Sequence, residues 1–323
     1  MLLTFDDFKA QGEEITALQR QAASAQLVHA LLLSGEEGVG KRTLARVIAA
    51  TLLCRDPGPR PCGQCPACRM VDSGEHPDLI EIRRGVPLAP DGKKDRATIP
   101  VEDIREMIRL CGQNTMSGGR RVVLLQDADT MTAQAQNCLL KTLEEPPPET
   151  WFLLMTAHPA NLLTTVISRC RILRMKPWTD EYIANVLRKQ GIGEYRALDA
   201  ARESNGSIGR AMRLAADEEY WKKREEILQC FFHTSGRSEV LRISGAWKDR
   251  KSEAEEIFSI LEAHTRQLLA DRLQEGPAIL ARFSAVLDRI QEARRLVQAN
   301  VNFQAVFEQL LLIFMGEGAL WQK

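Results

Sequence analysis

Short runs of four mostly apolar residues mark the first half of the chain. Each run is followed by a polar residue, and consecutive apolar positions are typical of parallel strands that are covered on both faces. Four strands are therefore predicted, at residues 30–33, 79–82, 122–125 and 152–155.

Apolar residues at helical spacing separate these runs. The spacing predicts helices at 42–53, 101–110 and 133–143. Residues 146–148 are three consecutive prolines, which stop the last of these helices because proline supplies no amide and clashes with the preceding turn. Strands that alternate with helices predict an α/β domain with a parallel sheet.

The pattern becomes helical after about residue 178. Thr179 is followed by two acidic residues, which predicts a helix N-terminus there, and Gly191 is typical of a helix end. A short helix is expected near 207–215, and amphipathic helices follow from about 218. Thirteen of the fourteen prolines lie at or before Pro177. Three domains are predicted: 1–177, 178–215 and 216–323.

The charge and the hydropathy of the chain bear on whether it binds nucleic acid, spans a membrane or is secreted. The 323 residues carry 43 basic and 43 acidic side chains, so the formal charge is zero. A dedicated nucleic-acid binder usually has a basic excess, so any contact with DNA is expected to be local or shared with other subunits. No apolar run is long enough to span a membrane, and the first residues do not resemble a secretory signal. We expect a cytoplasmic protein.

A glycine-rich segment follows the first predicted strand. Gly35, Gly38 and Gly40 are followed directly by Lys41 and then by a predicted helix. This order is that of a phosphate-binding loop, in which glycines allow amides to face a phosphate and the lysine reaches the β- and γ-phosphates. A glycine-rich turn with a surface lysine is the alternative reading.

The residue after the lysine departs from the phosphate-loop pattern. A serine or threonine hydroxyl ligates Mg²⁺ at this position, whereas this chain has Arg42, whose positive charge repels a cation. Thr43 lies one position on, about 100° around the helix, and is a poor substitute. Arg42 can neutralise a phosphate directly, so binding of ATP or ADP without metal-assisted hydrolysis stays open.

A second acidic motif follows the strand at 122–125. Asp127 stands where a Walker B carboxylate organises Mg²⁺, but the next position, where an active ATPase has glutamate, is Ala128. Asp129 lies two positions beyond Asp127. Both carboxylates could instead cap the next helix. Loss of the hydroxyl and of the glutamate predicts no useful ATP turnover.

Four cysteines cluster between residues 54 and 68. Four thiolates with two successive two-residue spacings match tetrahedral Zn²⁺, and Pro57, Pro59 and Pro61 argue against an apolar core that would hold the segment without a metal. An iron–sulfur cluster or free thiols are the alternatives. The predicted ligands of a structural zinc are Cys54, Cys62, Cys65 and Cys68.

Three motifs together resemble one known family. They are the four-cysteine insertion after the phosphate-loop helix, the segment MTAQAQNCLLKTLEEPP at 131–147, and Ser-Arg-Cys at 168–170. This combination is similar to bacterial clamp-loader subunits of the AAA+ class. The resemblance implies a P-loop AAA+ core with a parallel sheet and a zinc knuckle, a small helical lid domain and an all-α C-terminal collar domain.

The resemblance also implies roles for three further residues. Arg169 corresponds to an arginine finger that reaches the ATP of a neighbouring subunit. Thr156 matches the sensor-1 position, although a simple strand-end hydroxyl is an alternative. Arg210 matches the sensor-2 arginine, but it stands one place later than in the pattern of the catalytic subunits.

The resemblance implies a function in DNA replication. It implies a clamp-loader subunit of the DNA polymerase III holoenzyme that assembles with tau/gamma and delta subunits and acts on the sliding clamp and primed DNA. The damaged motifs favour a member that hydrolyses no ATP and donates Arg169 to a neighbour. A catalytically active ATPase subunit that uses Thr43 and Asp129 is the alternative, and a stand-alone zinc-containing DNA-binding protein fits the zero net charge poorly.

Overall fold

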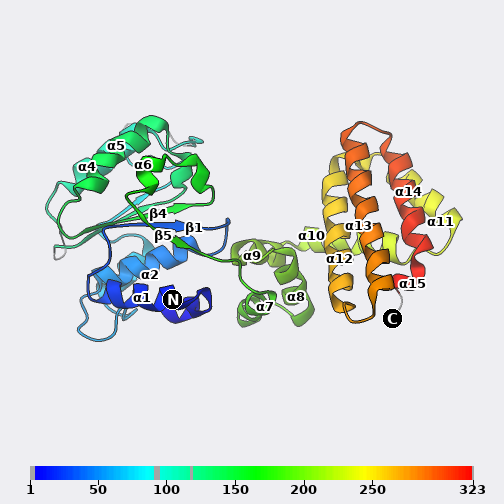
Figure 1. The fold of residues 1–323 in the computed structure, drawn as a ribbon, viewed down its shortest axis with the longest axis horizontal. Helices are drawn as coiled ribbons and strands as arrows, with labels where there is room; N and C mark the ends of the chain where they lie inside the picture. Colours follow the sequence, from blue (N-terminus) through cyan, green and yellow to red (C-terminus); the bar gives the residue numbers. More distant parts are fainter. Residues whose placement is uncertain (1–3, 91–94, 117–118, 322–323) are drawn as a thin grey trace. The chain divides into compact units, whose positions relative to one another are not determined.

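The computed structural model describes residues 4–90, 95–116 and 119–321. The chain forms two compact units (Figure 1). The N-terminal unit comprises Met1–Ile183 and Asn205–Arg210, and the C-terminal unit comprises Ala184–Ser204 and Ala211–Lys323. The segment Asn205–Arg210 lies in the predicted lid domain but belongs to the N-terminal unit, so the chain passes between the units more than once.

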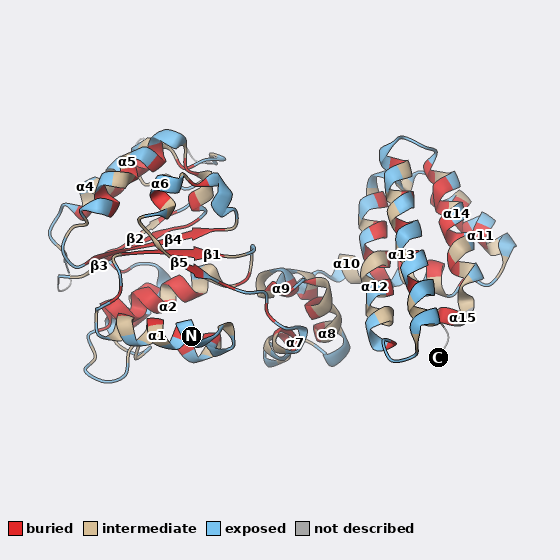
Figure 2. Ribbon diagram, in the orientation of Figure 1, coloured by how far each residue is buried: buried red, intermediate tan, exposed pale blue. Residues whose placement is uncertain are grey.

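The N-terminal unit contains a five-stranded sheet in which all pairs are parallel. The strand order is β2-β3-β4-β1-β5. The strands β1, β3 and β4 are buried throughout, in agreement with their continuous apolar sequences (Figure 2). The bounds of the strands are β1 Ala30–Ser34, β2 Leu79–Ile82, β3 Arg121–Leu125, β4 Thr150–Thr156 and β5 Arg171–Arg174.

The register defines two edges of this sheet. Leu31 of β1 pairs with Arg171 at the start of β5, and Ser34 pairs with Thr156 and Arg174 at the ends of β4 and β5. Because all strands are parallel, every segment that follows a strand leaves at the carboxyl edge and every segment that precedes one arrives at the amino edge. Three residue steps along β5 separate these edges by about 10 Å.

Helices cover both faces of the sheet. In Figure 1, α1 and α2 lie on one face and α4, α5 and α6 lie on the other. The second face buries Leu32, Phe152 and Leu154 against apolar side chains of α4, α5 and α6. The helices and 3-10 turns are η1 Phe5–Gln11, α1 Glu13–Ala23, α2 Lys41–Leu53, α3 Pro66–Ser73, α4 Val101–Cys111, η2 Ala128–Thr130, α5 Ala133–Glu144, η3 Pro159–Asn161 and α6 Thr164–Ile167, with α7 Asp180–Lys189 and α9 Ile208–Ala216 crossing between the units.

The described residues of the C-terminal unit form helices joined by short turns, and none of them lies in a strand. Its core is aromatic: the ring of Phe231 packs edge-on against Phe307 and Phe314, and Trp247 stacks on Phe307. No described helix combines the length and the apolar character needed to cross a membrane. The elements are α8 Glu194–Glu203, α10 Glu218–Phe232, α11 Arg237–Ala246, η4 Arg250–Glu253, α12 Ala254–Asp271, α13 Pro277–Gln298, α14 Phe303–Gly316 and α15 Gly318–Trp321.

The predicted fold class is confirmed by the parallel sheet and the helical C-terminal region. All four predicted strands and the three predicted helices between them are present, with ends shifted by at most two residues. The Thr179 hydroxyl accepts a hydrogen bond from the Tyr182 amide at 3.3 Å, which confirms the predicted helix start. The strand β5 was not predicted, because its sequence Arg-Ile-Leu-Arg has only two apolar residues and lies at an edge of the sheet. The three-domain division stays a prediction; its ends, residues 1–3 and 322–323, lie outside the described residues.

Candidate functional site

The predicted phosphate loop connects β1 to α2 at the carboxyl edge of the sheet. Gly38 has a φ of +77° and Gly40 a φ of +103°, backbone conformations that favour glycine. A Cβ on Gly38 would also lie 2.3 Å from the Ser207 hydroxyl, so a larger residue is excluded there. Strand, loop and helix N-terminus thus have the arrangement of a phosphate-binding loop.

Protein groups hold the outer side of this loop. Three consecutive carbonyls accept hydrogen bonds: that of Glu37 from the Ser207 hydroxyl (2.9 Å), that of Gly38 from the Gly209 amide (2.9 Å) and that of Val39 from the Trp178 indole (2.8 Å). All these residues belong to the N-terminal unit. The shape of the loop is therefore maintained by the chain itself.

Lys41 turns back over the loop that precedes it. Its Nζ donates to the carbonyls of Gly35 (2.6 Å) and Glu36 (2.8 Å). Burial lowers the pKa of the Lys41 ammonium, and the nearby carboxylates of Asp129 and Asp127 oppose this shift. The charge of the lysine is thus stabilised by both carboxylates of the acidic motif.

Arg42 is directed towards a carboxylate on β2. Its Nη2 lies 3.7 Å from Glu81 Oε2, and Arg46 Nη2 lies 2.7 Å from the other oxygen of the same carboxylate. Burial and the neighbouring Arg46 charge lower the pKa of Arg42. Arg42 occupies the position where a magnesium-dependent loop has a hydroxyl, and it shares the Glu81 carboxylate with Arg46. Two positive charges near this position are unfavourable for binding of a divalent cation. The Thr43 side chain is half-buried on the next position of α2.

The acidic motif directly follows β3. Asp127 is exposed and has a φ of +50°, and its carboxylate does not cap the 3-10 turn that it precedes. Asp129 Oδ1 accepts a hydrogen bond from the Thr156 hydroxyl at 2.7 Å. The same hydroxyl accepts from the His158 amide at 3.0 Å, so the side chain at the sensor-1 position is committed to protein partners.

Ala128 has no contact with solvent. Its side chain belongs to the apolar cluster beneath α4 and α5, together with Leu125 and Ile104. The position that carries glutamate in active ATPases of this type is therefore part of the hydrophobic core here.

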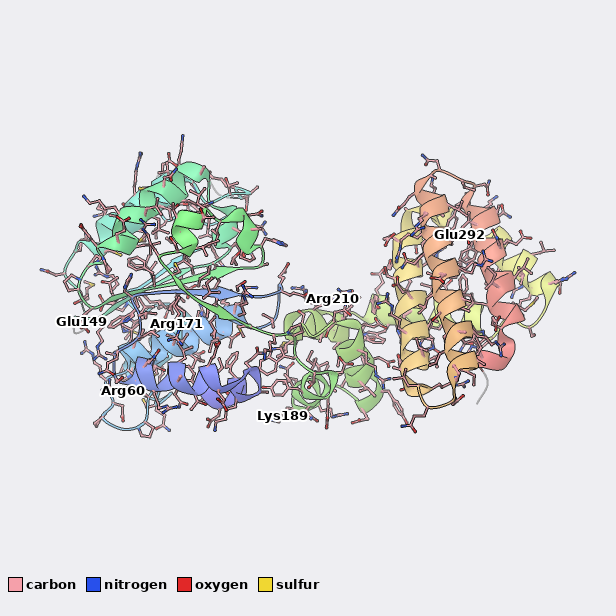
Figure 3. The ribbon with its side chains drawn as sticks, in the orientation of Figure 1. Arg60, Glu149, Arg171, Lys189, Arg210 and Glu292 are labelled. Atoms are coloured by element: carbon pink, nitrogen blue, oxygen red, sulfur yellow. The ribbon has the colours of Figure 1, made fainter. Side chains whose placement is uncertain are left out.

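Arg210 lies on α9, next to the segment that contacts the loop. Its amide is capped by the Ser207 hydroxyl at 3.1 Å, and the residue is exposed (Figure 3 labels it). The neighbouring Gly209 lies so close to the loop that a Cβ there would be 3.0 Å from the Cα of Gly38.

The four clustered cysteines bring their sulfur atoms together. All four Sγ atoms lie within 4.8 Å of one another, and the Cys54–Cys65 and Cys62–Cys68 pairs are 3.9 Å apart. Tetrahedral zinc with Zn–S bonds of about 2.3 Å requires sulfur atoms about 3.8 Å apart, so the donor set fits this ion. Cys54 ends α2 and Cys65 caps α3, so a bound metal would link the ends of both helices.

Arg169 lies at the opposite edge of the sheet from the phosphate loop. It follows α6 and precedes β5, whereas the loop follows β1, and β1 and β5 are neighbouring parallel strands. The partly buried Cys170 packs against the core, and the Ser168 hydroxyl donates to the Thr165 carbonyl at 3.1 Å. Ser168 and Cys170 are therefore held by the rest of the unit, and Arg169 between them is partly exposed.

The Arg169 guanidinium has partners within its own unit. Its Nε donates to Glu144 Oε1 at 2.8 Å, its Nη2 forms an ion pair with the same oxygen, and its Nη1 donates to the Thr165 carbonyl at 2.8 Å. The side chains of Arg169 and Glu144 are 31% and 49% exposed. This cation is therefore accessible from outside the unit.

Comparison with known proteins identifies the family. Residues 10–179 match the family model described as DNA polymerase III, delta subunit. A relative from Haemophilus influenzae, named DNA polymerase III subunit delta′, is 30% identical over 290 residues, which cover 88% of this chain and 85% of the relative. This chain belongs to the DNA polymerase III delta′ family.

Two further relatives, a delta′ subunit and a tau subunit, are similar to this member of the delta′ family. The Escherichia coli (strain K12) DNA polymerase III subunit delta′ is 38% identical over 208 residues, covering 64% of this chain and 60% of the relative. The DNA polymerase III subunit tau of the same strain is 35% identical over 219 residues, which cover 65% of this chain but only 32% of the relative. The similarity to tau lies in a part of that larger subunit.

Three contacts in this delta′ family member had no signal in the sequence. Glu144 lies 25 residues before its partner Arg169, and Ser207 and Trp178 contact a loop about 140 to 170 positions away. Glu144 is part of the segment that carries the family resemblance, but nothing in its local spacing indicates a partner. The predicted roles of the site residues stay predictions.

Proposed function

We propose that this chain is a clamp-loader subunit that hydrolyses no ATP and donates Arg169 to the nucleotide of a neighbouring subunit. In this role it assembles with tau/gamma and delta subunits and takes part in placing a sliding clamp on primed DNA. Membership of the delta′ family supports the assembly, and the positions of the phosphate loop and Arg169 support the division of labour.

The carboxyl edge of the sheet supports the absence of hydrolysis. Arg42 and Arg46 share Glu81 where a magnesium ligand would be needed, and Ala128 is buried in the core. Phosphoryl transfer depends on a metal ion and a group that orients the attacking water, each of which contributes orders of magnitude to the rate. The loop therefore serves as a structural element, with or without bound ATP or ADP.

The amino edge supports transfer in trans, and this observation carries the proposal. Arg169 cannot serve a nucleotide bound at the loop of its own sheet, because β5 separates the two edges by about 10 Å. A partly exposed arginine on the far edge suits a nucleotide bound by the next subunit. A guanidinium placed there stabilises the charge that develops on the γ-phosphate.

We further propose that the cysteine cluster holds a structural zinc ion. The sulfur separations match tetrahedral coordination, and four thiolates fill every position, so no site is left for substrate. The ion would supply stability rather than chemistry.

The test combines the isolated chain with a reconstituted loader. We expect no steady-state ATP hydrolysis by the isolated chain, and a fall of about 10³-fold in loader turnover with Arg169→Ala. Arg105→Ala, an exposed arginine on α4, is the matched control and should leave turnover unchanged. Robust hydrolysis by the isolated chain would favour an active ATPase subunit, and unchanged turnover with Arg169→Ala would refute donation in trans.

A further inference from the structure

The donors of Arg169 are nearly all occupied within the chain. A guanidinium has five N–H groups. The Nε and one N–H of Nη2 point to Glu144 Oε1, and Nη1 donates to the Thr165 carbonyl at 2.8 Å and approaches the Ser168 hydroxyl at 3.5 Å. A phosphate takes two parallel N–H groups from an arginine, so a bidentate contact requires that one of these partners be given up.

Glu144 is the partner that can be exchanged. The Thr165 carbonyl belongs to α6 and is fixed by the backbone, whereas the Glu144 carboxylate is a half-exposed side chain. Glu144 is also the last residue of α5, where the helix dipole disfavours a negative charge. The guanidinium compensates this charge, and an incoming phosphate would replace one anion by another.

We propose that Glu144 is a positioning residue that stores Arg169 in the free subunit and releases it when the phosphates of a neighbouring nucleotide compete for the guanidinium. This inference rests on the proposed function of Arg169 in trans. Each time Arg169 binds the neighbouring nucleotide, its guanidinium exchanges the Glu144 carboxylate for a phosphate. Glu144 therefore lowers the apparent affinity of the assembled site for nucleotide and does not contribute to the chemical step.

The variant Glu144→Gln tests the exchange. It keeps the size of the side chain and removes the charge, and Glu145→Gln is the matched control on the adjacent exposed acid. Exposed ion pairs contribute about 0.2–1 kcal/mol, which corresponds to a factor of about 1.4 to 5. We expect Glu144→Gln to lower the KM of the reconstituted loader for ATP by up to about fivefold with kcat unchanged, and the difference to shrink at high salt.

A double substitution shows whether Glu144 acts through Arg169. In an Arg169→Ala background, Glu144→Gln should have no further effect on KM, because the stored group is absent. In the free subunit, the NMR signal of the Arg169 Nε–H should shift with Glu144→Gln but not with Glu145→Gln. This second readout requires neither nucleotide nor activity.

The outcomes separate this inference from the proposed function. A loss of turnover with Arg169→Ala together with an unchanged KM for Glu144→Gln would overturn the storage role and leave donation in trans intact. A reduced kcat with Glu144→Gln would also overturn it, because the acid would then assist the productive arrangement. Unchanged turnover with Arg169→Ala would remove the foundation of both.

Discussion

The two edges of the sheet contain the residues proposed for the two halves of a nucleotide site, and these edges differ in the partners that their polar groups bind. At the carboxyl edge the loop carbonyls and Lys41 bond to backbone or buried groups of the same unit, and Thr156 bonds to the half-buried carboxylate of Asp129. At the amino edge Arg169 bonds to a half-exposed carboxylate and a helix-end carbonyl. The first set of partners is fixed by folding, whereas the second includes one that can be replaced.

This difference explains how the glycine pattern of the loop can be required by the fold, whether or not the loop takes part in hydrolysis. Gly38 and Gly40 are required by the backbone conformation, and Gly38 also by the close approach of Ser207, so the fold itself constrains both positions. An intact glycine pattern is consequently weak evidence for turnover. The chemistry must be judged from Arg42 and Ala128, whose side chains are not needed to shape the loop.

Matched substitutions at the two edges give the largest expected contrast. Arg169→Lys keeps the charge but loses the planar fork, so we expect loader turnover to fall by at least about 10²-fold. Arg42→Thr restores a hydroxyl at the loop and should change loader turnover by less than about twofold, because Ala128 still lacks the carboxylate. ATP hydrolysis by the reconstituted loader measures both. A larger loss with Arg42→Thr than with Arg169→Lys would reverse the assignment of the two edges.

The sequence predicted what is encoded locally and missed what depends on pairing across the fold. The phosphate loop, the four strands and the cysteine cluster each occupy one short segment with a defined spacing, and the structure contains all of them. The partnership of Arg169 with Glu144 depends on α5 and α6 packing together. The edge strand β5 has too few apolar residues to be distinguished from a loop.

The helix α2 connects the phosphate loop at the carboxyl edge to the cysteine cluster, so a substitution in the cluster tests how far the cluster stabilises this part of the fold. Lys41 starts this helix at the loop and Cys54 ends it at the cysteine cluster. Cys68→Ser removes one of four thiolates, so we expect loss of bound metal and a decrease of more than about 3 kcal/mol in the free energy of unfolding. Metal analysis and chemical denaturation measure these effects. Cys138→Ser, outside the cluster, is the control, and full metal content in Cys68→Ser would exclude a four-thiolate site.

Ala128 tests whether the carboxyl edge can regain catalysis. Because the side chain is buried among apolar residues, Ala128→Glu should lower the free energy of unfolding by about 3 kcal/mol and produce no ATP turnover. Burial raises the pKa of the new carboxyl in the folded state above its value in the unfolded state. The destabilisation by this group is therefore smallest below the unfolded pKa, and it grows as the pH rises towards the folded pKa. Ala128→Gln separates size from charge and should lack this pH dependence. ATP hydrolysis by Ala128→Glu would show that the position can face the nucleotide.

Ser207→Ala tests the contact that holds the loop from outside. The hydroxyl donates to the Glu37 carbonyl and accepts from the Arg210 amide, so its loss should cost about 1–2 kcal/mol and loosen residues 35–40. Ser24→Ala, which removes an exposed hydroxyl bonded to the Arg20 carbonyl at 2.9 Å, is the control and should cost less. Hydrogen exchange of the loop amides is the measurement. Unchanged exchange in Ser207→Ala would mean that the loop keeps its shape without this partner, and the distinction between a fixed and an exchangeable edge would then rest on Lys41 and Thr156 alone.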